Sequence, residues 1–221
     1  MHSSLDNLIE IQKEIQLKIT ELDNFIKFPK IIAVTKTHPM SSILPLINHG
    51  HIDYGENKVQ EALEKWQNIK SDFNHLNLHM IGKLQSNKAK YAVSLFDYIH
   101  SLDNIKLAEK ISSEQLKQNR KIKLFIQINI GDEPQKSGVS ILNIDEFYKN
   151  CVHNLGLNII GFMCLPPNND KVSTYFLRMK NLRINSKLKE LSMGMSNDYL
   201  EALKFNSTYL RIGSKIFGQR G

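Results

Sequence analysis

Two short segments in the last part of the chain combine glycine and serine in a pattern suited to binding an anion. The segment GMS covers residues 194–196, and the segment RIGS covers residues 211–214. Each leads into a predicted helix, whose first N–H groups are unpaired and lie at the positive end of the helix dipole. Either segment alone is better explained as an ordinary helix cap. Together they favour a phosphate site that is formed by Gly194, Ser196, Gly213 and Ser214.

Two cations interrupt runs of strand-like residues. Lys36 ends the run IIAVT, and Arg211 lies between TYL and IG. Taken singly, Lys36 is better explained as a strand-end residue that extends its charged head into solvent. For Arg211 the alternatives are a side chain directed to solvent at the barrel end and a cation directed into the barrel mouth. An amine that a rigid strand holds in a desolvated position becomes nucleophilic toward aldehydes. Lysine, arginine and a phosphate site together therefore indicate pyridoxal phosphate, held as a Schiff base on Lys36 with Arg211 as partner of the cofactor ring.

The elements that must position these residues begin with an amphipathic helix, expected within residues 1–27. Ser3 and Asp6 give it a capping-type start. Its apolar residues recur at spacings of three and four, which predicts one buried face. This stripe consists of Leu8, Ile11, Ile15, Ile19, Leu22 and Phe25.

Eight short β-rich runs follow, with polar or helical stretches between them. They cover residues 30–35, 51–55, 77–82, 97–101, 123–130, 157–165, 190–193 and 208–213. Helices are predicted between them, for example over residues 57–67, 86–96, 103–118 and 143–154. This alternation predicts a parallel sheet covered by helices. Eight repeats favour a (β/α)8 TIM barrel preceded by the N-terminal helix. The alternative is an open doubly wound sheet, but Lys36 stands where its glycine fingerprint would follow the first strand.

Length and composition narrow the class of protein. With 221 residues, the barrel has little room for inserted domains, and we expect one domain over residues 1–221. The longest apolar runs are too short for a membrane span, and no signal-peptide pattern opens the chain. The two cysteines lack metal-type spacing and favour a reducing, cytoplasmic location, with no metal site. The net charge of +7 is spread along the chain and comes mostly from lysine, which argues against nucleic-acid binding.

In a barrel, the chemistry lies at the carboxyl ends of the strands, and these positions match a known family. The chain resembles the YggS or PROSC-like pyridoxal phosphate homeostasis proteins, which are related to the N-terminal barrel of alanine racemase. The resemblance covers the chain from about residue 31 onward, in the segments AVTKTHP, YGENKVQEALEKW, HMIGKLQSNK, IHSLDN, QINIGDEPQKSG, LSMGMSNDYLEAL and YLRIGSKIFGQR.

The resemblance implies a role for each matching residue. Lys36 is the Schiff-base lysine, and Arg211 faces the pyridine nitrogen. The phosphate is held by Ser196, Gly213 and Ser214, with the backbone around Met195 alongside. Two departures are that Ser214 stands where threonine is common, and that the entrance stretch over residues 164–176 is shorter than is typical of the family. Further pocket residues are Asn57, His79 and Met163, with Lys136 near the mouth.

The implied function is to hold pyridoxal 5′-phosphate for vitamin B6 homeostasis and to pass it to apo enzymes. An arginine opposite the pyridine nitrogen disfavours protonation there, so the ring is a poor electron sink. We expect no counterpart of the second domain that supplies the opposing tyrosine in alanine racemase. The expected protein is therefore a monomeric cofactor carrier and not an enzyme that transforms amino acids. The alternatives are a weak racemase or lyase that uses Lys36 as its base, and a basic nucleic-acid binder without a cofactor.

Overall fold

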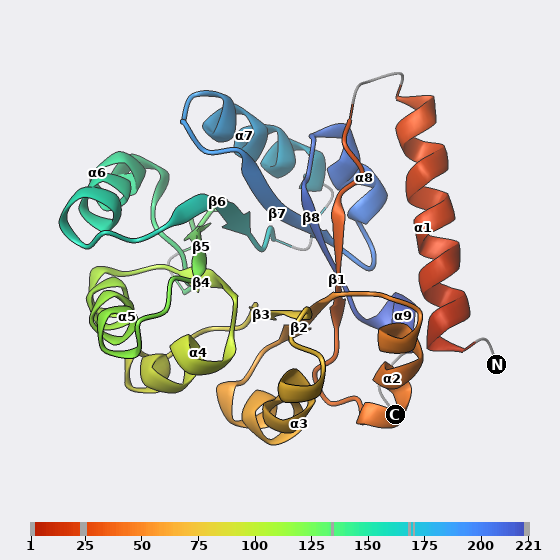
Figure 1. The fold of residues 1–221 in the computed structure, drawn as a ribbon. Coiled ribbons are helices and arrows are strands. Elements are labelled where there is room, and N and C mark those ends of the chain that lie inside the picture. The colour runs from red at the N-terminus through yellow and green to blue at the C-terminus, as the bar shows by residue number, and fades with distance from the viewer. Residues whose placement is uncertain (1–2, 23–25, 134, 168, 170, 219–221) are drawn as a thin grey trace.

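In a computed structural model, eight parallel strands close into a barrel in the order of the sequence (Figure 1). The structure describes residues 3–22, 26–133, 135–167, 169 and 171–218. The barrel closes where β1 pairs with β8, for example Ile32 with Arg211. The predicted TIM barrel is thereby confirmed, because an open doubly wound sheet leaves its two edge strands unpaired.

The strands are short and almost entirely buried, since a barrel strand is covered by the interior on one face and by helices on the other. This burial explains why they read as continuous apolar runs in the sequence. Each observed strand overlaps a predicted run. The strands are β1 (Lys30–Val34), β2 (Asp53–Glu56), β3 (Asn77–Met80), β4 (Tyr98–Leu102), β5 (Lys123–Ile128), β6 (Ile159–Cys164), β7 (Glu190–Met195) and β8 (Tyr209–Ile212).

The helices form a ring outside the strands, and the described residues contain them as α1 (Ser4–Glu21), α2 (Met40–Asn48), α3 (Val59–Asp72), α4 (Ala89–Leu95), α5 (Ile105–Gln118), α6 (Ile144–Lys149), α7 (Val172–Ile184), α8 (Tyr199–Lys204) and α9 (Ser214–Phe217). The helix predicted over residues 143–154 continues from α6 into a π turn over Asn150–Asn154. Pro45 lies inside α2, although proline is disfavoured in helix interiors.

The leading helix α1 begins with the predicted capping box, in which Ser3 and Asp6 satisfy each other's backbone N–H groups. Its residues Leu8, Ile11 and Ile15 are fully buried, whereas the predicted stripe residue Phe25 lies outside the described residues. Figure 1 shows α1 alongside α8 and α9. None of the described helices is both long and apolar enough to cross a membrane.

Polar contacts also tie α1 to α9. The Asn7 side chain donates a hydrogen bond to the carbonyl of Ile216, at 2.8 Å. Glu14 of α1 accepts hydrogen bonds from the ammonium of Lys215 and the hydroxyl of Tyr199. The leading helix therefore supports the short helix that follows β8.

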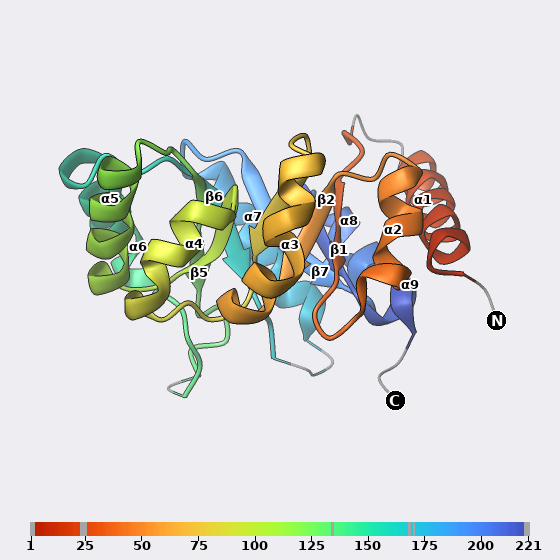
Figure 2. The same cartoon turned by 60° about the horizontal axis from the view of Figure 1, so that its bottom comes forward.

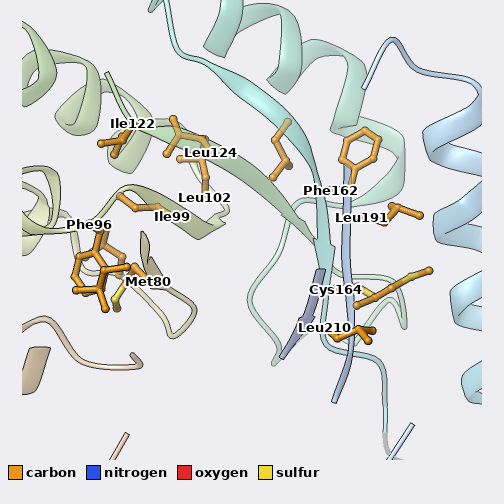
Figure 3. Close-up of a cluster of buried hydrophobic side chains, with 14 of the residues drawn as sticks. Met80, Phe96, Ile99, Leu102, Ile122, Leu124, Phe162, Cys164, Leu191 and Leu210 are labelled. Atoms are coloured by element: carbon orange, nitrogen blue, oxygen red, sulfur yellow. The ribbon is translucent and has the colours of Figure 1, made fainter. Parts of the chain in front are cut away.

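The main hydrophobic core lies between the strands and the surrounding helices, and Figure 3 labels part of it, including Phe96, Phe162 and Leu191. A second, smaller apolar cluster fills the inside of the barrel. It consists of Ile32, Tyr98, Phe125, Met163 and Tyr209. In Figure 2 the loops after β5 and β6 extend beyond the barrel on the side where α9 lies. The fold thus places a packed interior beneath one open end.

Candidate ligand-binding site at the carboxyl end of the barrel

A cavity of about 1010 Å³ opens at the carboxyl ends of the strands. Most of the site residues predicted from the sequence line it together, although they come from four different strand ends. They are Lys36, Asn57, Met195, Ser196, Arg211, Gly213 and Ser214, with Lys136 at the same cavity. Two predicted pocket residues, His79 and Met163, are fully buried and lie outside the set that lines the cavity.

The end of β1 is held on both sides of Lys36. On one side, the Thr35 hydroxyl donates to Glu56 Oε1 at 2.7 Å, and the Lys65 ammonium donates to the Thr35 carbonyl at 2.7 Å. On the other side, the N–H of Thr37 donates to Glu61. Thr37 has a φ of 65°, a left-handed conformation in which a β-branched residue is strained. These contacts fix the backbone that presents Lys36 to the cavity.

Glu56 is the hub of this support and is completely buried. Besides Thr35, its Oε1 accepts hydrogen bonds from the Trp66 indole at 3.0 Å and from Lys65 at 2.9 Å. Glu56 is the last residue of β2, and its carboxylate contacts the Trp66 indole of α3. Its role follows only from the packing of α3 against β2.

The two glycine–serine segments meet as predicted. The Ser196 hydroxyl accepts hydrogen bonds from the N–H groups of Gly213 and Lys215, both at 3.3 Å. These N–H groups lie at the start of α9. An anion bound next to Ser196 would accept hydrogen bonds from these same N–H groups at the start of α9.

Glycine is required in the first segment for a steric reason. Gly194 has a φ of +92°, and an added Cβ would lie 2.7 Å from the Cβ of Ala202. The turn at Gly194 is followed by a bond from the Met195 N–H to the Asp198 carboxylate, at 2.6 Å. Burial raises the pKa of this Asp198 carboxyl above its usual value. The loop after β7 is thus shaped closely before it reaches Ser196.

Arg211 forms part of the cavity floor and is only 4% exposed. Its Nη1 donates to Ser192 Oγ at 2.6 Å, and its Nη2 donates to the carbonyl of Cys164 at 2.8 Å. Burial lowers the pKa of the guanidinium, whereas Cys164 and Asp198 oppose that shift. The alternative of an arginine directed to solvent is excluded, and Arg211 is a fixed cation at the base of the cavity.

His79 and Met163 form the layer beneath this floor. The ring of His79 lies between Asp53 and His100, with hydrogen bonds of 2.9 Å and 3.0 Å to them. Met163 belongs to the apolar cluster inside the barrel. Barrel interiors are filled in successive layers of side chains, and closeness to a strand end in the sequence does not reveal the layer.

The mouth of the cavity carries both charge and an aromatic contact. Lys136 forms an ion pair with Glu133 at 2.6 Å, and its side chain is 39% exposed. His38 stacks on Phe217 with ring centroids 4.7 Å apart. The predicted entrance stretch is partly helical, because α7 begins at Val172.

This fold and this arrangement of strand-end residues define a barrel of the alanine racemase N-terminal type. A family model described as "Alanine racemase, N-terminal domain" matches residues 12–221. The alanine racemase from Corynebacterium glutamicum superposes with a TM-score of 0.68 at 16% identity, over 95% of this chain and 61% of the racemase, and shares the fold.

The chain belongs, within this type, to the family of pyridoxal phosphate homeostasis proteins. The relative of that name from Haemophilus influenzae is 35% identical over 97% of this chain and 94% of its own length. The one from Escherichia coli K12 is 31% identical over 100% of this chain and 98% of its own. PipY of Synechococcus elongatus, solved with PLP bound, has a TM-score of 0.79 and 31% identity, covering 92% of this chain and 100% of PipY.

Proposed function

We propose that the protein binds pyridoxal 5′-phosphate in this cavity and serves vitamin B6 homeostasis without strong activity on amino acids. One observation carries the proposal. The amine-bearing Lys36, the buried Arg211 and the serine-lined start of α9 line a single cavity. The relatives named for pyridoxal phosphate homeostasis and the PLP-bound PipY structure support the identity of the ligand.

The residues present fit this cofactor. A volume of about 1010 Å³ accommodates a ligand of this size, since small-molecule pockets commonly span roughly 300–1,000 Å³. The Ser196 hydroxyl and the N–H groups of Gly213 and Lys215 are the donor set that a phosphate needs. The cofactor itself supplies an aldehyde and an electron-withdrawing ring.

Each residue has a definite task in this proposal. Lys36 holds the aldehyde carbon as a Schiff base, and Ser196, Gly213 and Ser214 hold the phosphate. Arg211 faces the ring nitrogen, while Asn57 and Met195 line the walls. Since a guanidinium carries only donors, it gives a hydrogen bond to an unprotonated ring nitrogen and repels a protonated one. Arg211 therefore keeps the proton off this nitrogen, which weakens carbanion chemistry.

We extend the proposal to a cytoplasmic monomer, a single domain over residues 1–221 that binds no nucleic acid and hands the cofactor to apo enzymes. His79 and Met163 then act from the layer below, without lining the cavity.

The direct test is an absorbance spectrum before and after addition of pyridoxal phosphate, followed by borohydride reduction and peptide mass analysis. The expected result is a new visible band and a reduced adduct on Lys36. Failure of the protein to take up the cofactor overturns the proposal. Deuterium exchange at Cα of common amino acids, with many turnovers, would instead favour the weak racemase or lyase.

A further inference from the structure

A chain of hydrogen bonds crosses the inside of the barrel from the cavity floor toward the opposite end of the strands. Arg211 donates to Ser192 Oγ at 2.6 Å, and Ser192 Oγ lies 2.9 Å from His100 Nδ1. His100 Nε2 lies 3.0 Å from His79 Nδ1. His79 Nε2 ends the chain at Asp53 Oδ1, 2.9 Å away.

The five residues come from five strands, and each is at most 5% exposed. No bulk water competes for these bonds, so each polar group depends on its neighbour in the chain. The hydrogen atoms of this chain therefore adopt one arrangement. The residues at its two ends, Arg211 and Asp53, determine that arrangement.

The two ends set the direction of every bond between them. Arginine can only donate, and an ionised carboxylate can only accept. Burial alone would raise the pKa of Asp53, but the hydrogen bond from His79 and the charge of Lys30 hold it below its usual value. Asp53 is thus ionised at neutral pH and accepts a hydrogen from His79 Nε2.

The histidine tautomers follow from that end. Burial lowers the pKa of both imidazoles, so each ring is neutral and carries one hydrogen. With its hydrogen on Nε2, His79 accepts at Nδ1 from His100 Nε2–H. His100 then accepts at Nδ1 from the Ser192 hydroxyl. The hydroxyl hydrogen is committed to His100, and the serine lone pair faces Arg211.

We propose that Asp53 is a positioning residue for the ligand site, acting on Arg211 through His79, His100 and Ser192. The carboxylate orients the four donors of the chain, Arg211, Ser192, His100 and His79, in one direction. The remaining N–H groups of Arg211 are thereby held toward the cavity. The expected effect on cofactor binding rests on the proposed function, whereas the hydrogen-bond order and the restraint on Arg211 do not.

The charged neighbours of the chain are consistent with this role. The Nη1 and Nη2 groups of Arg211 donate to two neutral oxygens, Ser192 Oγ and the Cys164 carbonyl. Asp198 acts on the guanidinium from the loop after β7, and Lys30 acts on Asp53 from the start of β1. Asn77 donates a further hydrogen bond to Asp53 Oδ1 at 3.0 Å.

The first test uses the ligand-free protein and 15N NMR of its histidine and arginine side chains. We expect His79 and His100 both to be neutral with hydrogen on Nε2, and the Arg211 guanidinium to rotate slowly. D53N removes the charge, and S192A breaks the chain next to the arginine. Both variants should speed rotation of the guanidinium, and D53N should give mixed histidine tautomers.

Y98F is the matched control. The Tyr98 ring stacks on His79 with centroids 4.2 Å apart, but its hydroxyl contacts Lys30 and Lys123 and takes no part in the chain. Y98F should leave the tautomers of His79 and His100 and the rotation rate of the Arg211 guanidinium unchanged. The proposal is overturned if wild-type His79 or His100 carries its hydrogen on Nδ1. It is also overturned if Y98F speeds rotation of the Arg211 guanidinium as much as D53N does.

The second test measures pyridoxal phosphate affinity by titration. D53N and S192A should weaken binding about tenfold and shift the absorbance maximum, as expected when a hydrogen bond to a charged group is lost. Y98F should stay within about twofold of wild type. Equal affinities for D53N and Y98F would contradict the proposal. If the wild-type protein binds no cofactor and still shows the expected histidine tautomers and slow rotation of the Arg211 guanidinium, only the proposed function is overturned.

Discussion

The two ends of β1 carry the same residue type in opposite surroundings. At its start, Lys30 lies over the rings of Tyr98 and Tyr209, with its ammonium 5.4 Å and 5.3 Å from their centroids. Just beyond its end, Lys36 lines a cavity of about 1010 Å³. The strand is the same, and the packing around each ammonium differs. The comparison teaches that the neighbours of a lysine, and not its place at a strand end, decide whether it can meet a ligand.

The same contrast extends to the whole barrel. At the amino end, polar groups satisfy one another, as when Lys123 donates to the Tyr98 hydroxyl at 3.0 Å and Asn77 donates to Asp53. At the carboxyl end, Ser196 and Arg211 lie around a hollow. One end is packed for stability and the other is shaped for binding, as in barrels generally.

The largest expected effect comes from exchanging Lys36. Lys36→Ala should abolish the borohydride-trapped adduct, because no amine remains at the end of β1 to bond the aldehyde. The matched control Lys30→Ala removes an amine from the other end of the same strand and should retain the adduct. Mass analysis of reduced, digested protein measures both, and an unchanged yield in Lys36→Ala would refute the comparison.

A smaller effect is expected at the phosphate site. Ser196→Ala removes the hydroxyl that faces the start of α9 and should weaken pyridoxal phosphate binding about tenfold, the value of a hydrogen bond to a charged group. Binding of pyridoxal, which lacks the phosphate, should change little. Fluorescence titration with both ligands provides the measurement. Equal losses for the two ligands would show that Ser196 does not contact the phosphate.

Acid should expose the buried interior of the barrel. Burial lowers the pKa of His79 and His100. Below the usual histidine pKa, the unfolded chain therefore binds protons at these two residues that the folded chain does not bind. Stability is therefore full above about pH 6.5, the usual histidine value, and falls as the pH drops through the range below it. Asp53, whose pKa is held low, adds a further loss only in stronger acid, below its usual value.

Urea unfolding at pH 7.5 and pH 5.5 measures this dependence. His153 is exposed, so His153→Gln should leave the slope of stability against pH as it is in the wild type. His100→Asn, which removes one of the buried imidazoles, should make that slope shallower. Parallel slopes for all three proteins would mean that the buried pair does not govern acid stability.

The smallest effect is expected at the amino end of the barrel. Lys30→Met should lower the free energy of unfolding by about 1 kcal/mol, since it removes the cation from two aromatic rings. Cofactor affinity at neutral pH should stay within about twofold of wild type. Urea unfolding and titration test the two parts. If Lys30→Met lost as much cofactor binding as Lys36→Ala, the proposed difference between the two ends of β1 would be contradicted.

The eight strands could be predicted because barrel strands are buried on both faces and keep apolar, β-branched runs. The cavity residues Lys36, Ser196 and Arg211 could be predicted because the carboxyl ends of parallel strands converge. The depth of a residue was harder to judge. His79 and Met163 lie near strand ends in the sequence, yet both side chains are fully buried below the cavity.

Other features depend on contacts that no local pattern records. His100 gains its role only from facing His79 on β3 and Ser192 on β7. Glu56 is identified as a support for β1 only once α3 packs against its strand.

The pairing of β1 with β8 has a consequence for how the protein is made. Ile32 and Arg211 become neighbours only when the first and last strands meet, so the contact spans most of the sequence. Closing so long a loop is entropically costly and late in folding. On the ribosome, Lys36 would emerge long before Ser214. The cavity can therefore form only after β8 has been synthesised and has reached β1, which makes ligand capture a signal that the barrel has finished folding.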